Sequence, residues 1–307
     1  LAGIENSDRP LPDPDSDDTR RYLTWCADLA ASLDLGVPLL EGAAQGLGTI
    51  PGDFGHEALD SHAQRHPDHP PLWTGLRSGR HDTFGGVRQT RPAEDMAYAM
   101  ARFFAAGGTG MTYSLWHGGT SFGREGAYRQ APRHDFDAPL DEFGLDTIKY
   151  HHLSKLHRIL ADFAPALLID RPPAPSRTVG VQTAWTYEGG GRTLTFLCND
   201  DPHLKATVDW SGASHDLPPR SVTLVGDGRA LMNTARIDPA ARIVRAMRPL
   251  NRALSGFVGW IEPMPELWPR DLRADLRMKE PVEQLQFTHD ETDYTWYSAA
   301  LHSDVRD

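Results

Sequence analysis

Apolar and polar positions follow helical and strand-like periods in turn over the first 165 residues. Between Thr19 and Leu33 the apolar residues recur at three- and four-residue steps, which predicts one helix with a buried stripe. The stripe consists of Tyr22, Trp25, Cys26, Leu29, Ala30 and Leu33. The predicted elements are, in order, helix 19–33, strand 37–40, strand 71–75, helix 92–106, strand 110–116 and helix 150–163. This alternation favours a parallel α/β architecture.

The pattern changes after the proline-rich run RPPAPS at 171–176. Alternating β-branched residues separated by Gly, Asp or Pro turns predict strands at 193–199, 206–210 and 221–226, which form a small antiparallel domain. The domains expected are 1–165 for the α/β part, 166–236 for the antiparallel β domain, and 237–307 for a connection and the start of a jelly-roll-like β domain.

Composition and charge exclude some classes of binding partner. The chain of 307 residues is 39% hydrophobic, and no run approaches the roughly 18 apolar residues of a membrane span. The net charge is -11 and no segment carries a cluster of Lys and Arg, which argues against nucleic acid or an anionic membrane as a partner. This negative charge is compatible with a neutral substrate such as a sugar. Cys26 and Cys198 lack the spacing of a zinc site or a disulfide framework, so we expect buried free thiols and no cofactor.

The N-terminus carries no localisation signal. The chain begins at Leu1, without a charged region followed by an apolar one, so we expect the encoded protein to begin further upstream. The Asp- and Pro-rich run at 8–18 predicts a solvated loop that ends in residues able to cap a helix.

Eleven segments together are more informative than any one motif. They are GIEN (3–6), YLTWCADLA (22–30), GVP (36–38), LWT (72–74), FGG (84–86), RPAEDMAYAMARFF (91–104), WHGGTSFGR (116–124), DFDAPLDEFGL (135–145), DLPPRSVTL (216–224), NTA (233–235) and FTHDETDYTWY (287–297). In this order they resemble glycoside hydrolase family 35, most closely its plant-type β-galactosidases. The resemblance implies the C-terminal half of a (β/α)8 TIM barrel, entered at about the fourth strand, followed by antiparallel β domains.

The resemblance also places the two catalytic positions. Retaining glycosidases use two carboxylates about 5 to 5.5 Å apart, one as acid/base and one as nucleophile. The family's acid/base glutamate follows Ile-Glu-Asn and its nucleophile follows Trp-Thr; the corresponding residues here are Ser7 and Gly75. Ser7 has no neighbouring base in the sequence and Gly75 has no side chain, so neither can supply the chemistry.

Positions that hold the sugar in the family are also changed. Two expected tyrosines correspond to Ser114 and Phe136, and Pro51 takes the place of an expected Asn. Asn6 alone is plainly retained. The substrate-binding positions inferred from the resemblance are therefore Asn6, Ser114 and Phe136.

Three other carboxylates were considered as substitutes. Glu5 lies two residues before Ser7 and therefore about 6 to 7 Å deeper in the same strand. Asp8 faces the other way, and Glu41 lies at the end of a different strand. We expect no surrogate catalytic pair.

Several residues invite a functional interpretation but fit a structural one better. His117 predicts a turn, because no partner stands at metal-ligand spacing. The histidines at 151, 152 and 157 predict surface or packing roles, and the acidic run at 135–142 predicts a rim loop bonded to backbone. Tryptophans at 116, 210 and 296 predict core packing over sugar stacking.

Three hypotheses follow. The first is a β-galactosidase homologue whose ancestral activity, retaining hydrolysis of terminal non-reducing β-D-galactose, is lost in this chain. The second is a non-catalytic carbohydrate-binding or scaffold protein, with a β-galactoside or another glycan as ligand. The third is a truncated fragment without independent function.

A barrel needs a closed ring of paired strands, so four strands leave open edges. We predict that the isolated chain folds poorly or associates unless another chain supplies the missing strands. Size-exclusion chromatography with light scattering, combined with a thermal scan, measures this. A sharp two-state melt of a monomer contradicts the prediction.

Overall fold

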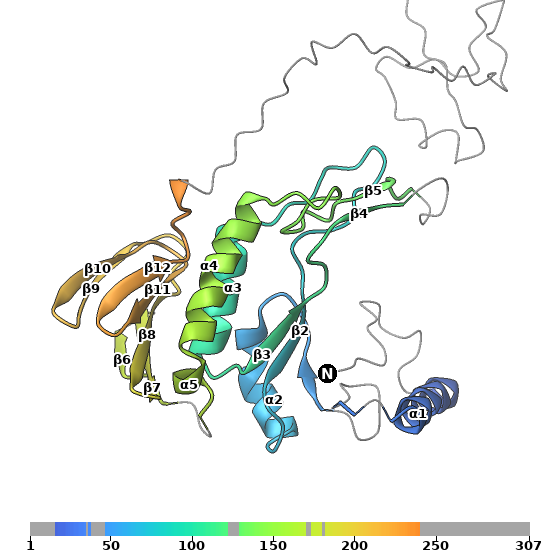
Figure 1. Cartoon of the computed structure of the whole chain (residues 1–307), viewed down its shortest axis with the longest axis horizontal. Coiled ribbons are helices and arrows are strands. Elements are labelled where there is room, and N and C mark those ends of the chain that lie inside the picture. The colour runs from blue at the N-terminus through green and yellow to red at the C-terminus, as the bar shows by residue number, and fades with distance from the viewer. Residues whose placement is uncertain are drawn as a thin grey trace, which may run out of the picture.

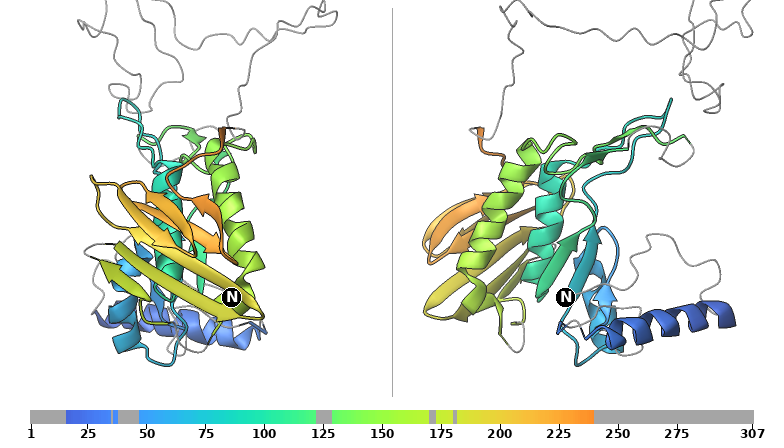
Figure 2. Two further views of the ribbon diagram at one scale, coloured as in Figure 1. Left: turned by 90° about the vertical axis from the view of Figure 1, so that its left-hand side faces the viewer. Right: turned by 45° about the vertical axis from the view of Figure 1, so that its right-hand side comes forward.

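The structure is a computed structural model that describes residues 16–34, 36–37, 47–121, 129–169, 173–179 and 182–239. Within these residues a parallel sheet, a layer of helices and an antiparallel sheet follow one another (Figures 1 and 2). The predicted strand residues 38–40 and the predicted elements beyond residue 239 lie outside the described residues. No helix of the described part combines the length and apolar character needed to cross a bilayer.

Helix α1 (Asp17–Ser32) confirms the first predicted helix. The Ser16 side chain accepts a hydrogen bond from the backbone N–H of Thr19 at 3.2 Å, and Asp17 and Asp18 lie in the first turn, where acidic side chains stabilise the helix dipole. The predicted burial of its apolar stripe is confirmed for Cys26, which is 7% exposed, and is wrong for the four largest side chains of the stripe. Tyr22, Trp25, Leu29 and Leu33 are 44–60% exposed, because no described element lies over them (Figure 1).

The parallel sheet has the order β1-β2-β3, with β1 (Thr49–Ile50), β2 (Leu72–Leu76) and β3 (Gly110–Tyr113). Two of its strands confirm the strands predicted at 71–75 and 110–116, although the second is shorter. Strand β1 was not predicted, because a strand of two residues is too short to show a period in the sequence. Within the described residues, β1 and β3 each pair on one side only, so both edges of this sheet are unpaired.

The helical layer contains η1 (Gly55–Ala58), α2 (Leu59–Arg65), α3 (Ala93–Ala105), α4 (Ile148–Asp162) and α5 (Ala164–Leu167). Helices α3 and α4 confirm the predictions at 92–106 and 150–163. Helix α3 lies between the two sheets: the Phe103 ring packs against Trp73 of β2 at 5.4 Å, while the next carbonyls, of Phe104 and Ala105, accept hydrogen bonds from the Tyr187 hydroxyl of the antiparallel sheet.

The antiparallel sheet has the order β12-β11-β8-β7-β6. Its strands are β6 (Arg177–Val179), β7 (Gln182–Gly189), β8 (Arg192–Asn199), β11 (Ser221–Gly226) and β12 (Arg229–Asn233). A hairpin of β9 (Ala206–Trp210) and β10 (Ala213–Leu217) covers its outer face, and β4 (Gly119–Thr120) pairs with β5 (Arg133–His134) elsewhere. The three predicted strands of this domain are confirmed.

Strand β7 was not predicted, although the sequence carries two signals for it. Residues 185–188 alternate apolar and polar, and Gly190 and Gly191 follow the strand with φ of +59° and +74°, as a two-residue hairpin requires.

One apolar cluster joins the two sheets through the helices. It includes Trp73 of the parallel sheet, Phe103 and Leu153 of the helices, and Phe196 and Leu224 of the antiparallel sheet. Cys26 and Cys198 are both buried free thiols, as expected. The domain boundary near 165 stays a prediction.

The ionisation of His56 makes the stability of the folded chain depend on pH. Burial and the nearby Arg102 guanidinium lower the pKa of His56 from 6.5 to about 4. Within the part of the chain that the structure describes, its Nδ1 has no hydrogen-bond partner. Between those pH values the unfolded chain binds more protons than the folded one, so the free energy of unfolding falls as pH drops from 6.5 to 4. Since the ring is partly exposed, we expect His56 to account for about 1 to 2 kcal/mol of this loss.

His56→Phe should therefore flatten the dependence of stability on pH between 4 and 6.5, measured by urea unfolding across that range. His81→Phe, at an exposed position, is the matched control and should leave the slope unchanged. An unaltered slope in His56→Phe contradicts the assignment.

Candidate functional site

Gly75, the residue at the predicted nucleophile position, lies near the carboxyl end of β2. The pairing of β2 with β3 shifts between Trp73 and Leu76, so Thr74 and Gly75 form a bulge in the strand. Gly75 has φ of +80°, which a residue with a side chain rarely adopts. The backbone at position 75 thus has a conformation that favours glycine. Because glycine has no side chain, no carboxylate is present at this position.

Ser114, a predicted sugar-holding position, is in direct contact with Gly75. Its hydroxyl donates to the Gly75 carbonyl at 2.9 Å, and the Gly75 N–H donates to the Thr112 hydroxyl at 3.3 Å. A Cβ added at Gly75 would lie 3.3 Å from Ser114 Oγ. The two positions therefore meet at the carboxyl edge of the parallel sheet, where barrel enzymes place their catalytic groups.

Phe136 lies on a rim loop and is tied to the same edge through Ser78. The Ser78 hydroxyl is within reach of the Leu115 carbonyl at 3.4 Å and the Phe136 carbonyl at 3.2 Å. Phe136 has φ of +58°, and its ring packs near His134 at 5.4 Å. The structure thus brings Gly75 and Ser114 into contact, and the Ser78 hydroxyl connects Phe136 to Leu115, the residue that follows Ser114.

Lys149 of α4 holds that loop in place, and its side chain is 8% exposed. The ammonium group donates to the carbonyls of Ser78 at 2.9 Å and Asp137 at 2.6 Å and forms an ion pair with the Asp137 carboxylate. Burial lowers the pKa of Lys149, and the bonds to Asp137 oppose that shift. Lys149 is thus a positioning residue.

Arg91 ties three rim segments together. Its guanidinium donates to the carbonyls of Arg77 at 3.0 Å and Asp53 at 3.1 Å and pairs with Asp95 at 2.6 Å, while its N–H donates to Asp137 at 2.8 Å. The sequence predictions assign no role to Arg91 or Lys149. Arg91 begins the segment RPAEDMAYAMARFF, and this is the one sequence signal that marks it.

The remaining site predictions fall into two groups. Asn6, Ser7 and the carboxylates considered as surrogates (Glu5, Asp8 and Glu41) lie outside the described residues. Pro51 directly follows β1 at the same edge of the sheet and is exposed.

The histidines have structural contacts. The His117 ring bonds to the neighbouring Gly118 carbonyl, in agreement with a turn. His152 bonds to the Thr234 carbonyl at 2.8 Å, His157 to the Tyr113 hydroxyl at 2.7 Å, and His151 to Asp146 at 2.6 Å. In the described part of the chain no group of three or more His, Cys, Asp or Glu residues is arranged to hold a metal ion.

The acidic run and Trp116 also have structural roles. Asp141 accepts hydrogen bonds from the N–H groups of Phe143 and Leu145, as a rim loop bonded to backbone requires. Asp135, by contrast, pairs with arginine side chains. Trp116 packs against the main core, as predicted.

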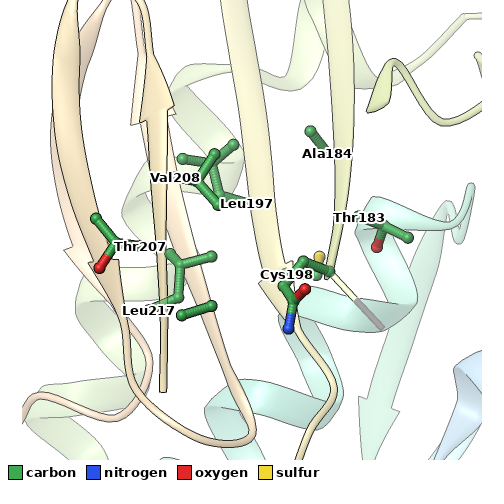
Figure 3. A pocket seen from close by; sticks show the side chains of 9 residues that line it. Thr183, Ala184, Leu197, Cys198, Thr207, Val208 and Leu217 are labelled. Carbon is green, nitrogen blue, oxygen red and sulfur yellow. The ribbon is translucent and has the colours of Figure 1, made fainter. Parts of the chain in front are cut away.

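A cavity of about 80 Å³ lies between the antiparallel sheet and the β9–β10 hairpin (Figure 3). Its walls include Ala184, Leu197, Val208 and Leu217, which are apolar. An apolar cavity of about 150 Å³ holds a molecule the size of benzene, so this smaller one does not fit a sugar.

Comparisons with known proteins agree with this picture. The family described as "Glycosyl hydrolases family 35" matches residues 18–160. The whole chain is 32% identical to part of "Beta-galactosidase 12" of Oryza sativa subsp. japonica, covering 34% of that protein. Over 92% of its length it is 31% identical to "Beta-galactosidase 10" of Arabidopsis thaliana, covering 38% of it.

A solved structure, the cyclic alpha-maltosyl-(1-->6)-maltose hydrolase from Arthrobacter globiformis, aligns with 56% of this chain and 39% of its own at 18% identity. Its TM-score of 0.32 is too low to bear on the fold.

The parallel sheet with its helices, the site at the carboxyl edge and these similarities define a protein of the glycoside hydrolase class. More specifically, the chain belongs to glycoside hydrolase family 35, a family of barrel-type glycosidases. It spans about a third of the length of the β-galactosidases it matches.

We predict that Lys149→Met lowers the free energy of unfolding by about 2 to 4 kcal/mol, because it leaves the Asp137 carboxylate without its buried cation. Lys155→Met on the same helix is the control, since Lys155 is exposed and should change stability by less than about 0.5 kcal/mol. Urea unfolding measures both. Equal losses in the two variants would show that Lys149 does not anchor the rim.

Proposed function

We propose that this chain is a family 35 β-galactosidase homologue that does not hydrolyse β-galactosides by the retaining mechanism. Its role is then non-catalytic, as a carbohydrate-binding or scaffold protein. Family membership supports the β-galactoside as ancestral substrate, since the relatives carry that name. A galactoside or another glycan is the ligand expected for a binding role.

One observation carries the proposal. The retaining mechanism needs a carboxylate that attacks the anomeric carbon, and the position expected to supply it holds Gly75. The positive φ of Gly75 adds to this, because a glutamate there strains the backbone by roughly 1 to 3 kcal/mol unless the bulge rearranges. The loss of the side chain is therefore accompanied by a backbone that suits glycine.

The same proposal includes a partner. Within the described residues the parallel sheet has unpaired edges at β1 and β3, and the apolar face of α1 is exposed. Unpaired edges and apolar helix faces are the surfaces through which chains associate. Another chain that supplies the remaining barrel strands would cover them.

The decisive test is release of nitrophenol from nitrophenyl β-D-galactopyranoside by the purified chain, prepared from a host without β-galactosidase. We expect no release above the buffer rate. Gly75→Glu should also be inactive and should melt at a lower temperature than the unmodified chain, because its backbone is strained.

Asn6→Ala distinguishes real activity from contamination. Hydrolysis by the unmodified chain that disappears in Asn6→Ala refutes the proposal, because Asn6 is the retained sugar-binding position. Hydrolysis that is identical in both proteins comes from a contaminant.

A further inference from the structure

A groove of about 480 Å³ lies on the outer face of the antiparallel sheet, beside the β9–β10 hairpin. This face points away from the helices, because the side chains that pack on the helices, such as Tyr187 and Phe196, alternate with those that line the groove. The antiparallel and parallel sheets lie on opposite sides of the helical layer (Figure 1). The groove therefore lies on a different layer from Gly75, which belongs to β2 of the parallel sheet.

Hydroxyl groups form the floor of the groove. Thr186 of β7 stands directly opposite Thr195 of β8, and their hydroxyls are 3.1 Å apart. Two register positions further, and so on the same face, Thr193 stands opposite Glu188. A threonine hydroxyl both donates and accepts hydrogen bonds, so this row complements the hydroxyls of a sugar, which do the same.

Two exposed carboxylates line the groove. In the described part of the chain, the carboxylates of Glu188 on β7 and Asp209 on β9 form no hydrogen bond or ion pair, so both are available as acceptors. Among the described residues that line the groove, none is basic. An anionic ligand is therefore disfavoured, whereas a neutral polyhydroxyl ligand gains charge-assisted hydrogen bonds.

Trp210 supplies the apolar side. It is half-buried and packs against the small cluster that contains Ala184, Leu197 and Val225, which fixes its orientation, and its remaining surface lines the groove. The turn Ser211–Gly212, with φ of +51° and +77°, holds it at the end of the hairpin. The negative face of an aromatic ring attracts polarised C–H groups, such as those on one face of a pyranose.

A purely structural role for Trp210 explains its buried part. A structural role does not explain why the exposed part of Trp210 lies beside a row of threonine hydroxyls and two carboxylates without hydrogen-bond partners among the described residues. We propose that this groove binds a neutral pyranoside, with Trp210 stacking on the sugar ring and Thr186, Glu188 and Asp209 bonding its hydroxyls. The proposal is independent of the barrel-derived site and of whether that site is active.

The test is isothermal calorimetry on the full chain with methyl β-D-galactopyranoside, methyl β-D-glucopyranoside and a β-linked galactobiose. We expect a dissociation constant in the millimolar range for at least one of them, and no heat with galacturonate. Trp210→Ala should weaken binding by about tenfold or more, which corresponds to about 1.4 kcal/mol. Trp25→Ala is the matched control, because Trp25 is 59% exposed and lies on α1 outside the groove.

Two smaller changes keep the test informative if Trp210→Ala does not fold. Thr186→Val removes a hydroxyl without changing the shape, and Asp209→Asn removes a charge at an exposed position. Each should weaken binding while the melting temperature stays within a few degrees of the unmodified chain.

Four outcomes overturn the proposal. They are no heat with any neutral sugar up to about 50 mM, far above a millimolar dissociation constant; undiminished binding in a folded Trp210→Ala or in both smaller variants; binding of galacturonate as tight as that of galactoside; and loss of binding in Asn6→Ala. The last result would place the sugar in the barrel-derived site.

Discussion

Helix α3 is buried on two faces at once, and the arrangement of the described part depends on this constraint. A helix between two sheets can expose almost no polar side chain, and nine residues of α3 are buried, five of them alanines. Small side chains allow both sheets to approach closely, and the larger Met96, Met100 and Phe103 fill the spaces between them. At its two ends α3 meets polar partners: Arg102 pairs with Asp200 of the antiparallel domain, and Asp95 pairs with Arg220. The two sheets are therefore held by one shared core as well as by ion pairs.

This constraint also fixes the place of Gly75, the residue at the predicted nucleophile position. The packing of α3 on Trp73 fixes β2, and the carboxyl end of β2 then carries Gly75 to its position beside Ser114. Arg91 and Lys149 hold the rim loops by backbone carbonyls, and none of these bonds involves the predicted catalytic positions. The contacts that hold the rim loops are therefore independent of the side chain at position 75.

Helices and strands whose apolar residues recur at a regular spacing could be predicted from the sequence. Features that depend on contacts between residues far apart in the chain could not. Helices α3 and α4 and strand β8 were predicted because their apolar spacing is determined locally. The stripe of α1 was found, but periodicity shows only that an apolar face exists and does not identify what covers it, so its burial was predicted wrongly. Gly75 and Ser114 could be placed because family motifs mark them. The role of Lys149 could not, because it bonds to Ser78, 71 residues away in the chain.

The two candidate sites differ in what they require of their surroundings. A barrel site needs side chains from strands around a closed ring, and within the described residues the parallel sheet has unpaired edges. The groove at Trp210 is lined by residues of β7, β8, β9 and β11 and of the turns that follow β9 and β11. These strands are paired within the antiparallel sheet and within the hairpin. Its floor is positioned by the same strands that pack on α3, so its geometry does not depend on any partner chain. The proposed sugar binding at this groove would therefore use contacts that are independent of the parallel sheet.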